Sequence, residues 1–245
     1  MTQQQLPTTN EHGQRLGRPV DWSGARRPER IALQGQGVRL EPIGPQHVDD
    51  LVASVCGEDD DALWTYLFWD RPRDRAEMAA IVERGAGDEG QVMYAIVAVE
   101  TARAVGFCSL MRLDPEMGSI EIGGIAFGRQ LQRSRAATEA MALLMRHVFD
   151  DLGYRRYEWK CDSLNAPSRR AAIRLGFIWE GRFRNAVVYK GRNRDTDWFS
   201  ITDREWPRVR QALDDWLDER NFDAMGRQRV RLAARPPETD PKKEQ

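Results

Sequence analysis

The chain has 245 residues, of which 41% are hydrophobic and 31% are charged, and its formal net charge is −1. This length suits one large domain that buries its own core. The balanced charge argues against nucleic acid as a partner. No apolar stretch approaches the roughly 18 residues of a membrane span, and the polar start does not resemble a signal peptide. We therefore expect a cytoplasmic protein that binds neither membranes nor nucleic acids.

Three cysteines stand far apart, at Cys56, Cys108 and Cys161, and no CxxC pair occurs. This spacing predicts neither a disulfide framework nor a zinc site, so we expect no metal. Cys108 and Cys161 fall in strand patterns, and we interpret them as core residues.

The two ends of the chain differ in composition from its middle. Residues 1–30 are rich in Gln, Arg, Gly and Pro, which predicts an N-terminal arm that contacts the body through Trp22. Residues 226–245 end in ARPPETDPKKEQ, which is typical of a disordered tail. The middle, residues 31–225, contains no internal repeat and no linker, so we expect one domain there.

The first elements of this domain are a strand and two helices. Alternating apolar residues predict the strand at 38–42, and apolar spacings of three and four predict helices at 45–56 and 73–84. β-Branched and aromatic residues then predict three consecutive strands. These strands cover residues 92–99, 104–113 and 119–127.

The most regular helix of the chain follows at 136–152, and Gly153 ends it. Asn165 and Pro167 are typical of the start of a further short helix, which ends before Gly176. The remaining elements are strands at 154–161, 177–183, 187–189 and 196–202 and a helix at 205–217. This order predicts a mixed α/β fold, in which an antiparallel meander leads into one β-α-β unit.

Three segments between residues 119 and 181 resemble, in order and spacing, the core of the GNAT N-acetyltransferases. They are SIEIGGIAF (119–127), LQRSRAATEAMALLMRHVF (131–149) and LNAPSRRAAIRLGFIWEG (164–181). The resemblance is closest to the ribosomal-protein N-acetyltransferase-like (RimJ/RimL-like) branch. It implies the GNAT acyl-CoA N-acyltransferase fold, an α/β (α+β) fold with a mixed, mostly antiparallel sheet flanked by helices.

The same resemblance implies an activity. Members of the family transfer the acetyl group of acetyl-CoA to a primary amine by direct attack, without a metal ion. The acceptor would be a small molecule or a peptide N-terminus, and the sequence leaves both open, as it leaves open a homodimer. The alternative is a non-catalytic acyl-CoA sensor or structural module that retains the fold.

The loop that runs into the helix at residue 136 is the expected pyrophosphate site, because a helix N-terminus presents unpaired N–H groups to an anion. Arg135 stands where the family has Gly, and Arg133 stands where a second Gly is common. Either these guanidiniums contact phosphate, or they are solvated on a loop of altered shape. The resemblance assigns coenzyme A binding to Gln132, Arg133, Ser134, Arg135, Ala136, Ala137 and Thr138.

The resemblance also implies acid–base residues. Glu121 matches the position of the family's general base, where a carboxylate takes the proton of the amine. Ser168 matches the position that protonates the leaving thiolate, and Asn165 is expected beside the pantetheine arm. The alternatives are a Glu121 on the solvent side of an edge strand and a purely capping role for Asn165 and Ser168. The N–H groups of Ile125, Ala126 and Phe127 are expected to polarise the thioester oxygen.

An acidic run at 58–61 precedes the aromatic residues Trp64, Tyr66, Phe68 and Trp69. In this family the corresponding segment often lines the acceptor site, and acidic and aromatic groups together suit a cationic amine. Packing in the core is the alternative. We interpret the charged segment 190–195 as a solvated hairpin turn. The alternatives are contact with the cofactor's 3′-phosphate or with a partner subunit.

Overall fold

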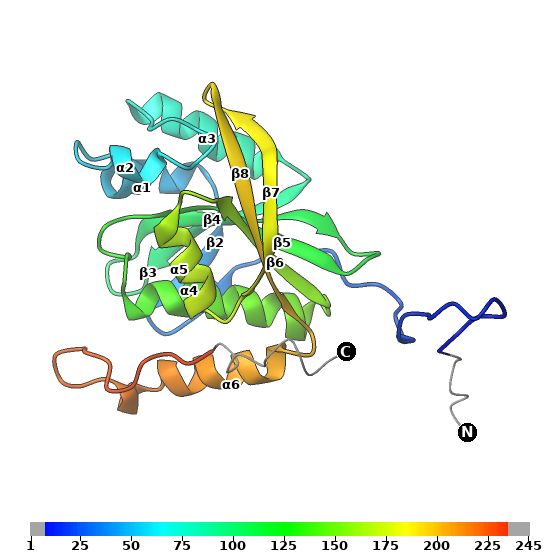
Figure 1. The fold of residues 1–245 in the computed structure, drawn as a ribbon. Helices are drawn as coiled ribbons and strands as arrows, with labels where there is room; N and C mark the ends of the chain where they lie inside the picture. The colour runs from blue at the N-terminus through cyan, green and yellow to red at the C-terminus, as the bar shows by residue number, and fades with distance from the viewer. Residues whose placement is uncertain (1–7, 235–245) are drawn as a thin grey trace.

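An eight-stranded sheet is the centre of residues 8–234, the part of the chain that the computed structural model describes. Its strand order is β1-β2-β3-β4-β5-β6-β8-β7, with one parallel pair, β5 and β6, among antiparallel neighbours (Figure 1). This confirms the predicted fold class. The strands are β1 (Leu33–Gln34), β2 (Val38–Pro42), β3 (Gln91–Ala98), β4 (Arg103–Asp114), β5 (Ser119–Phe127), β6 (Arg156–Asp162), β7 (Ile178–Tyr189) and β8 (Arg192–Thr202).

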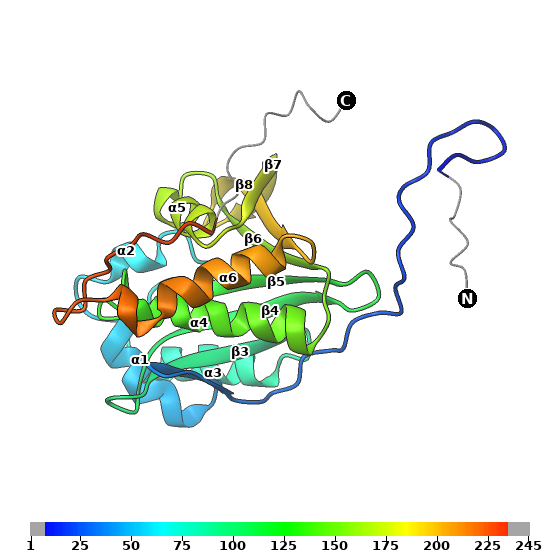
Figure 2. The ribbon, with the colours of Figure 1, turned by 90° about the horizontal axis from the view of Figure 1, so that it is seen from below.

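Helices cover both faces of this sheet. α4 and α6 lie side by side on one face, and α1 and α3 lie on the opposite face (Figure 2). The helices are α1 (Val48–Val55), α2 (Asp61–Trp64), α3 (Arg75–Gly87), α4 (Arg135–Arg146), α5 (Ala166–Arg174) and α6 (Trp206–Leu217). The sequence reasoning missed two short elements, α2 and β1.

The core has two parts because the central strands are buried on both faces. On β3, Tyr94 and Ile96 pack with Leu144 of α4, whereas Met93 and Ala95 pack with Leu51 of α1. Successive side chains of a strand point to opposite faces, and helices on both sides then require a continuous apolar run.

β5 and β6 are paired over only part of their length. The parallel ladder joins residues 119–122 to residues 156–159 and ends there. β4 stays paired with β5 as far as Phe127, and β8 stays paired with β6 as far as Asp162. Beyond the ladder the sheet therefore divides, and a V-shaped opening separates the end of β5 from the end of β6.

The helix predicted at 136–152 ends differently from the prediction. α4 stops at Arg146, and His147–Asp151 form a π turn. The turn places Phe149 against Trp206 of α6, with the two rings stacked at 5.0 Å between centroids. Local helix propensity does not include this contact with a later helix, so the sequence pattern could not predict where α4 ends.

One strand, β7, replaces the two strands predicted at 177–183 and 187–189. It is continuous but bulged between Phe183 and Val187. Asn185 in the bulge has a φ of +51°, and its N–H donates to Asp195 of β8 over 2.8 Å. Asn adopts this left-handed conformation more readily than most residues and is common in turns. The sequence of the bulge therefore looks like a turn between two strands.

Trp22 contacts the body as predicted, and its indole N–H donates to the Glu116 carbonyl over 2.6 Å. Residues 8–21 extend away from the sheet in both views (Figures 1 and 2). At the other end, the Val230 N–H donates to Asn221, and Ala234 is buried. Residues 1–7 of the predicted arm and 235–245 of the predicted tail lie outside the described residues. Within the described range, no helix has the length and apolarity to cross a membrane.

Candidate active site

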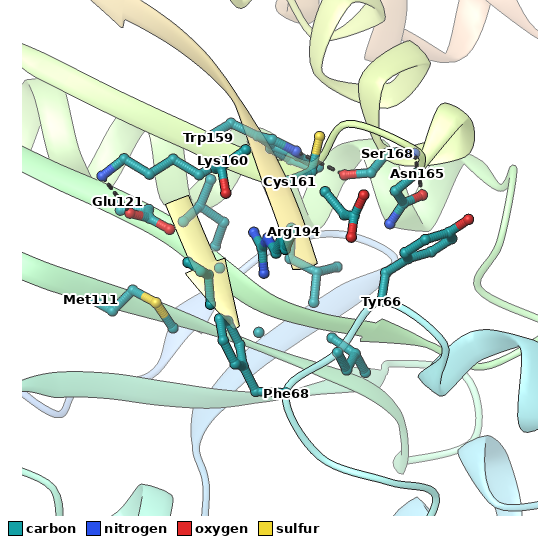
Figure 3. A pocket seen from close by; sticks show the side chains of 18 of the residues that line it. Tyr66, Phe68, Met111, Glu121, Trp159, Lys160, Cys161, Asn165, Ser168 and Arg194 are labelled. Carbon is teal, nitrogen blue, oxygen red and sulfur yellow. Dashed lines mark hydrogen bonds and ion pairs between the residues drawn. The ribbon is translucent and has the colours of Figure 1, made fainter. Parts of the chain in front are cut away.

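A cavity of about 490 Å³ opens where β5 and β6 separate (Figure 3). Its walls come mainly from strands β4 to β8, the start of α5 and the segment that follows α2. The lining residues with polar or titratable groups include Arg112, Glu121, Lys160, Cys161, Asp162, Asn165, Ser168 and Arg194.

Glu121 is buried on β5 and lines this cavity. Its Oε2 lies 2.8 Å from Lys160 Nζ and 2.8 Å from Arg112 Nε. Among the described residues, no group donates a hydrogen bond to its Oε1. Since β5 is an inner strand, the alternative of a solvent-facing Glu121 does not hold. Its role as a general base stays a prediction.

Lys160 bridges two carboxylates on neighbouring strands. Glu121 and Glu158 are direct neighbours in the parallel ladder, an arrangement that is unfavourable for like charges. Lys160 Nζ lies 2.7 Å from Glu158 Oε2 and 3.8 Å from the centre of the Trp198 ring. The ammonium group therefore bridges two buried acids, each of which also pairs with an arginine, Glu121 with Arg112 and Glu158 with Arg156.

The sequence reasoning did not identify Lys160 as part of the site. A signal was present, because Lys160 is one of only four lysines in a chain rich in arginine, and it lies in a predicted strand. It also stands two residues after Glu158, so both side chains share one face of β6.

Arg112 reaches Glu121 through a bulge in β4. The register of β4 against β5 shifts between Met111 and Asp114, and Arg112 has a φ of +50°. A non-glycine residue in this conformation costs of order 1 kcal/mol or more, so the surrounding structure must favour it. The ion pair with Glu121 is one such contribution.

Asn165 and Ser168 form the start of α5. The Asn165 Oδ1 accepts the Ser168 N–H over 3.0 Å, as expected of an N-cap residue. The Ser168 hydroxyl oxygen in turn accepts the Trp159 indole N–H over 2.9 Å (Figure 3). Both residues line the cavity, so the capping role and a position at the site coexist.

Cys161 also lines the cavity, as a buried thiol rather than a pure core residue. Burial raises its pKa to about 11. The side chain therefore stays protonated near neutral pH and is unsuited to nucleophilic attack, which requires the thiolate.

The loop before α4 lies outside the cavity, and most of its side chains hold the loop itself. Gln132 donates to the Phe127 carbonyl at the end of β5, and Ser134 caps α4 by accepting the Ala137 N–H. Thr138 is buried and accepts a hydrogen bond from Arg174. These contacts account for the polar residues of the loop. None of the three side chains needs a ligand to explain its presence.

Three backbone N–H groups at this loop have no acceptor within the described part of the chain, those of Arg133, Arg135 and Ala136. Arg133 has a φ of +59°, the left-handed conformation for which the family uses Gly. The N–H groups of a left-handed residue and of the first helical turn together form a concave anion site.

The Arg135 side chain is held by the C-terminal part of the domain. Its guanidinium donates to the Leu217 carbonyl over 2.5 Å and lies 4.7 Å from the centre of the Phe222 ring. The Arg133 side chain is exposed. Phosphate contact by either side chain stays a prediction, and Arg133 is the better placed of the two.

Two glycines on β5 keep one wall of the cavity open. Gly124 has a φ of +58°, and a Cβ on Gly123 would lie 2.8 Å from the Met111 sulfur. Ile125 lines the cavity, whereas Ala126 is buried and pairs with Phe107 of β4. The roles predicted for the N–H groups of Ile125, Ala126 and Phe127 stay untested.

The aromatic residues at the end of α2 and just after it are divided between core and cavity. Trp64 is buried, and its indole N–H donates to the Val55 carbonyl over 2.8 Å. Tyr66, Phe68 and Trp69 line the cavity. The prediction of a solvated turn at 190–195 holds only in part. Lys190 donates to the Trp64 carbonyl, which fixes the tip of the β7–β8 hairpin to the aromatic segment, and Arg194 is buried.

The described residues contain no group of three or more His, Cys, Asp and Glu side chains that could hold a metal ion. The divided sheet, the unpaired N–H groups at the N-terminus of α4 and the cavity lined by Glu121 and Ser168 are the features expected of an acyltransferase.

Comparison with known proteins identifies the family. Residues 38–178 match the model of the acetyltransferase (GNAT) domain. The crystal structure of a GCN5-related N-acetyltransferase from Brucella melitensis is 46% identical, with a TM-score of 0.85 over 86% of this chain and 96% of that chain. The chain belongs to the GNAT acetyltransferase family.

Two curated relatives bear on the branch. An uncharacterized N-acetyltransferase p20 from Bacillus licheniformis is 34% identical over 48% of this chain. A putative ribosomal N-acetyltransferase YdaF from Bacillus subtilis (strain 168) is 29% identical over 41% of this chain. The alignments span 66% and 55% of the lengths of these two relatives. The similarity to the ribosomal N-acetyltransferase-like branch is confirmed at this level.

We predict that Lys160→Met lowers the free energy of unfolding by about 3 kcal/mol, because it removes the cation that two buried carboxylates share and leaves each of them only its arginine, Arg112 or Arg156. Urea unfolding at pH 7 measures the change. The control is Lys190→Met, which removes a partly exposed ion pair with Asp70 and a hydrogen bond to the Trp64 carbonyl and should cost about 1 kcal/mol. Equal losses in the two variants would contradict a structural role for the Lys160 bridge.

Proposed function

We propose that this protein transfers the acetyl group of acetyl-CoA to a primary amine of a small molecule or a peptide N-terminus. One observation carries the proposal: a buried carboxylate, Glu121, and a hydroxyl, Ser168, line one cavity at the opening between β5 and β6. Family membership supports the reaction class.

The residues present suit acetyl-CoA. The N–H groups of Arg133, Arg135 and Ala136 offer an anion site for the pyrophosphate. The opening beside residues 123–127 offers unpaired strand backbone to the pantetheine arm, which is rich in amide groups. When bound, acetyl-CoA supplies an activated acetyl thioester. The protein must then position an amine, remove its proton and supply one to the sulfur.

Glu121 removes the proton of the amine in this proposal, directly or through a water molecule. Its Oε2 is occupied by Lys160 and Arg112, which fixes the carboxylate plane and leaves Oε1 toward the cavity. A general base must reach the proton with a fixed geometry, and the two ion pairs provide this.

Ser168 supplies a proton to the leaving sulfur. Its oxygen accepts the Trp159 N–H, so the hydroxyl hydrogen is available for another acceptor. A hydrogen bond received by the oxygen also strengthens the hydroxyl as a donor. Direct transfer is favoured over a covalent cysteine intermediate, because the Cys161 thiol has a pKa of about 11.

Acetyl-CoA is expected to raise the melting temperature of the full chain, since a ligand that binds only the native state stabilises it by mass action. At 100 times the Kd the gain is about 2.7 kcal/mol. Differential scanning fluorimetry measures it, with adenosine as a control ligand that lacks the pyrophosphate and the pantetheine. No shift up to about a millimolar would refute the cofactor assignment. A shift without release of coenzyme A thiol on any amine would favour the sensor.

Substitution of the two loop arginines should have different effects, on ligand affinity at Arg133 and on stability at Arg135. Arg133→Ala is expected to weaken acetyl-CoA by about tenfold and leave acetyl-pantetheine unaffected, because only the former carries phosphate. Arg135→Ala should instead lower the free energy of unfolding by about 1 kcal/mol, through the lost contacts with Leu217 and Phe222. Calorimetric titration and urea unfolding measure these effects. Equal losses for both ligands in Arg133→Ala would show that the substitution acts through loop shape.

Glu121→Gln is expected to lower kcat by roughly 10² to 10⁴, the usual contribution of a general base. The side chain keeps its size but cannot accept a proton. The deficit should shrink as pH rises, because more of the amine is then already neutral. Thiol release measured from pH 6 to 9 tests this, with Glu100→Gln in an exposed turn as the control. A wild-type pH profile in Glu121→Gln would eliminate Glu121 as the base.

A further inference from the structure

Arg194 is a buried cation with no carboxylate in ion-pair contact among the described residues. Its residue is only 7% exposed, and its Nε has no hydrogen-bond partner among the described residues. No carboxylate oxygen of the described chain lies within 4.0 Å of its guanidinium. Burying a charge without a partner is costly, so such an arrangement points to a ligand that supplies the missing charge.

Neighbouring side chains hold this guanidinium in place. Arg194 lies on β8 with its nitrogens pointing into the cavity (Figure 3). Its guanidinium carbon is 5.0 Å from the centre of the Phe68 ring and 5.7 Å from that of Tyr189. Contacts with two aromatic rings orient the group and leave its N–H edge for an oxygen acceptor.

Two more unpaired donors follow Arg194 on the same face of β8. Thr196 Oγ1 and Trp198 Nε1 are buried, line the cavity and have no partner among the described residues. Residues 194, 196 and 198 alternate along one strand, so their side chains point to the same side. The wall therefore presents a positive charge together with two neutral donors.

The other charged groups of the cavity already have partners. Lys160 and Arg112 are paired with Glu121. Asp162 accepts the Tyr189 hydroxyl over 2.7 Å and the Leu164 N–H over 2.8 Å. The lining side chains carry three positive charges, on Arg112, Lys160 and Arg194, and two negative ones, on Glu121 and Asp162. The net charge of +1 matches a monoanion such as a carboxylate better than a phosphate ester, which carries a charge near −2 at pH 7.

The anion does not come from the proposed cofactor. The loop assigned to the pyrophosphate, residues 132–138, does not line this cavity, and the pantetheine arm is uncharged. We infer that Arg194, with Thr196 and Trp198, binds a carboxylate of the acceptor, so that the acceptor is an amine that carries a carboxylate. This inference rests on the proposed function and narrows its substrate class.

The test compares amino acids with their carboxamides, in which only the anion is removed. The panel is β-alanine, 4-aminobutyrate, 6-aminohexanoate and glycine, each with its amide, at saturating acetyl-CoA. The wild-type chain should favour the carboxylates in kcat/KM by about tenfold or more, the usual size of a charge-assisted hydrogen bond. Arg194→Gln should bring this preference close to one. Arg192→Gln, an exposed arginine on the same strand, should retain it.

Two measurements separate the possible failures. Arg194→Gln should keep the melting shift given by acetyl-CoA, which shows that the fold and the cofactor site are intact. The N-acetyl derivatives of the same panel, tested for binding to the coenzyme A complex, need no turnover.

The inference is overturned if carboxylates and amides bind alike to the wild-type chain, or if Arg194→Gln discriminates as the wild type does. Preference for O-phosphoethanolamine over every carboxylate would also overturn it. A different result would refute the proposed transfer reaction instead. In that case no amine is acetylated, but the protein still binds carboxylates more tightly than amides and loses this preference in Arg194→Gln.

Discussion

The short parallel ladder between β5 and β6 is the constraint on which the site depends. Only residues 119–122 and 156–159 are paired, and beyond them each strand follows its other neighbour. The unpaired backbone of β5 would be costly in a closed sheet, where buried N–H and C=O groups need partners. At the end of a divided sheet it becomes a surface for an extended ligand. The fold thus creates its binding opening by ending a ladder early.

The same ladder brings two acids together. Glu121 and Glu158 are paired in register, and their proximity is tolerable because Lys160 bridges them. A buried cluster of acids and cations is expensive to assemble, and hydrophobic residues of similar volume are often as stabilising. The arrangement is therefore better explained by chemistry at the cavity than by stability.

Local sequence patterns predicted the elements that position the site, including the exact bounds of β5 and the cap at Asn165. The resemblance added the loop before α4 and the position of Glu121. Lys160 and Arg194 were missed, because their meaning lies in which charges stand beside them across strands that are distant in sequence. The π turn after α4 and the bulge in β7 were missed for a related reason. Both are set by contacts with α6 and β8 rather than by the residues of the element itself.

Gly123 and Met111 have a consequence for how the site distinguishes substrates. The missing Cβ of Gly123 leaves the space that the Met111 thioether occupies on the cavity wall. A methionine side chain is unbranched and has several rotatable bonds, so this wall adapts its shape at little cost. Opposite it, the donors of β8 belong to a strand fixed by ladders on both sides. Selection by length or bulk should accordingly be permissive at this site, and homologous amines of different size should compete for it on nearly equal terms.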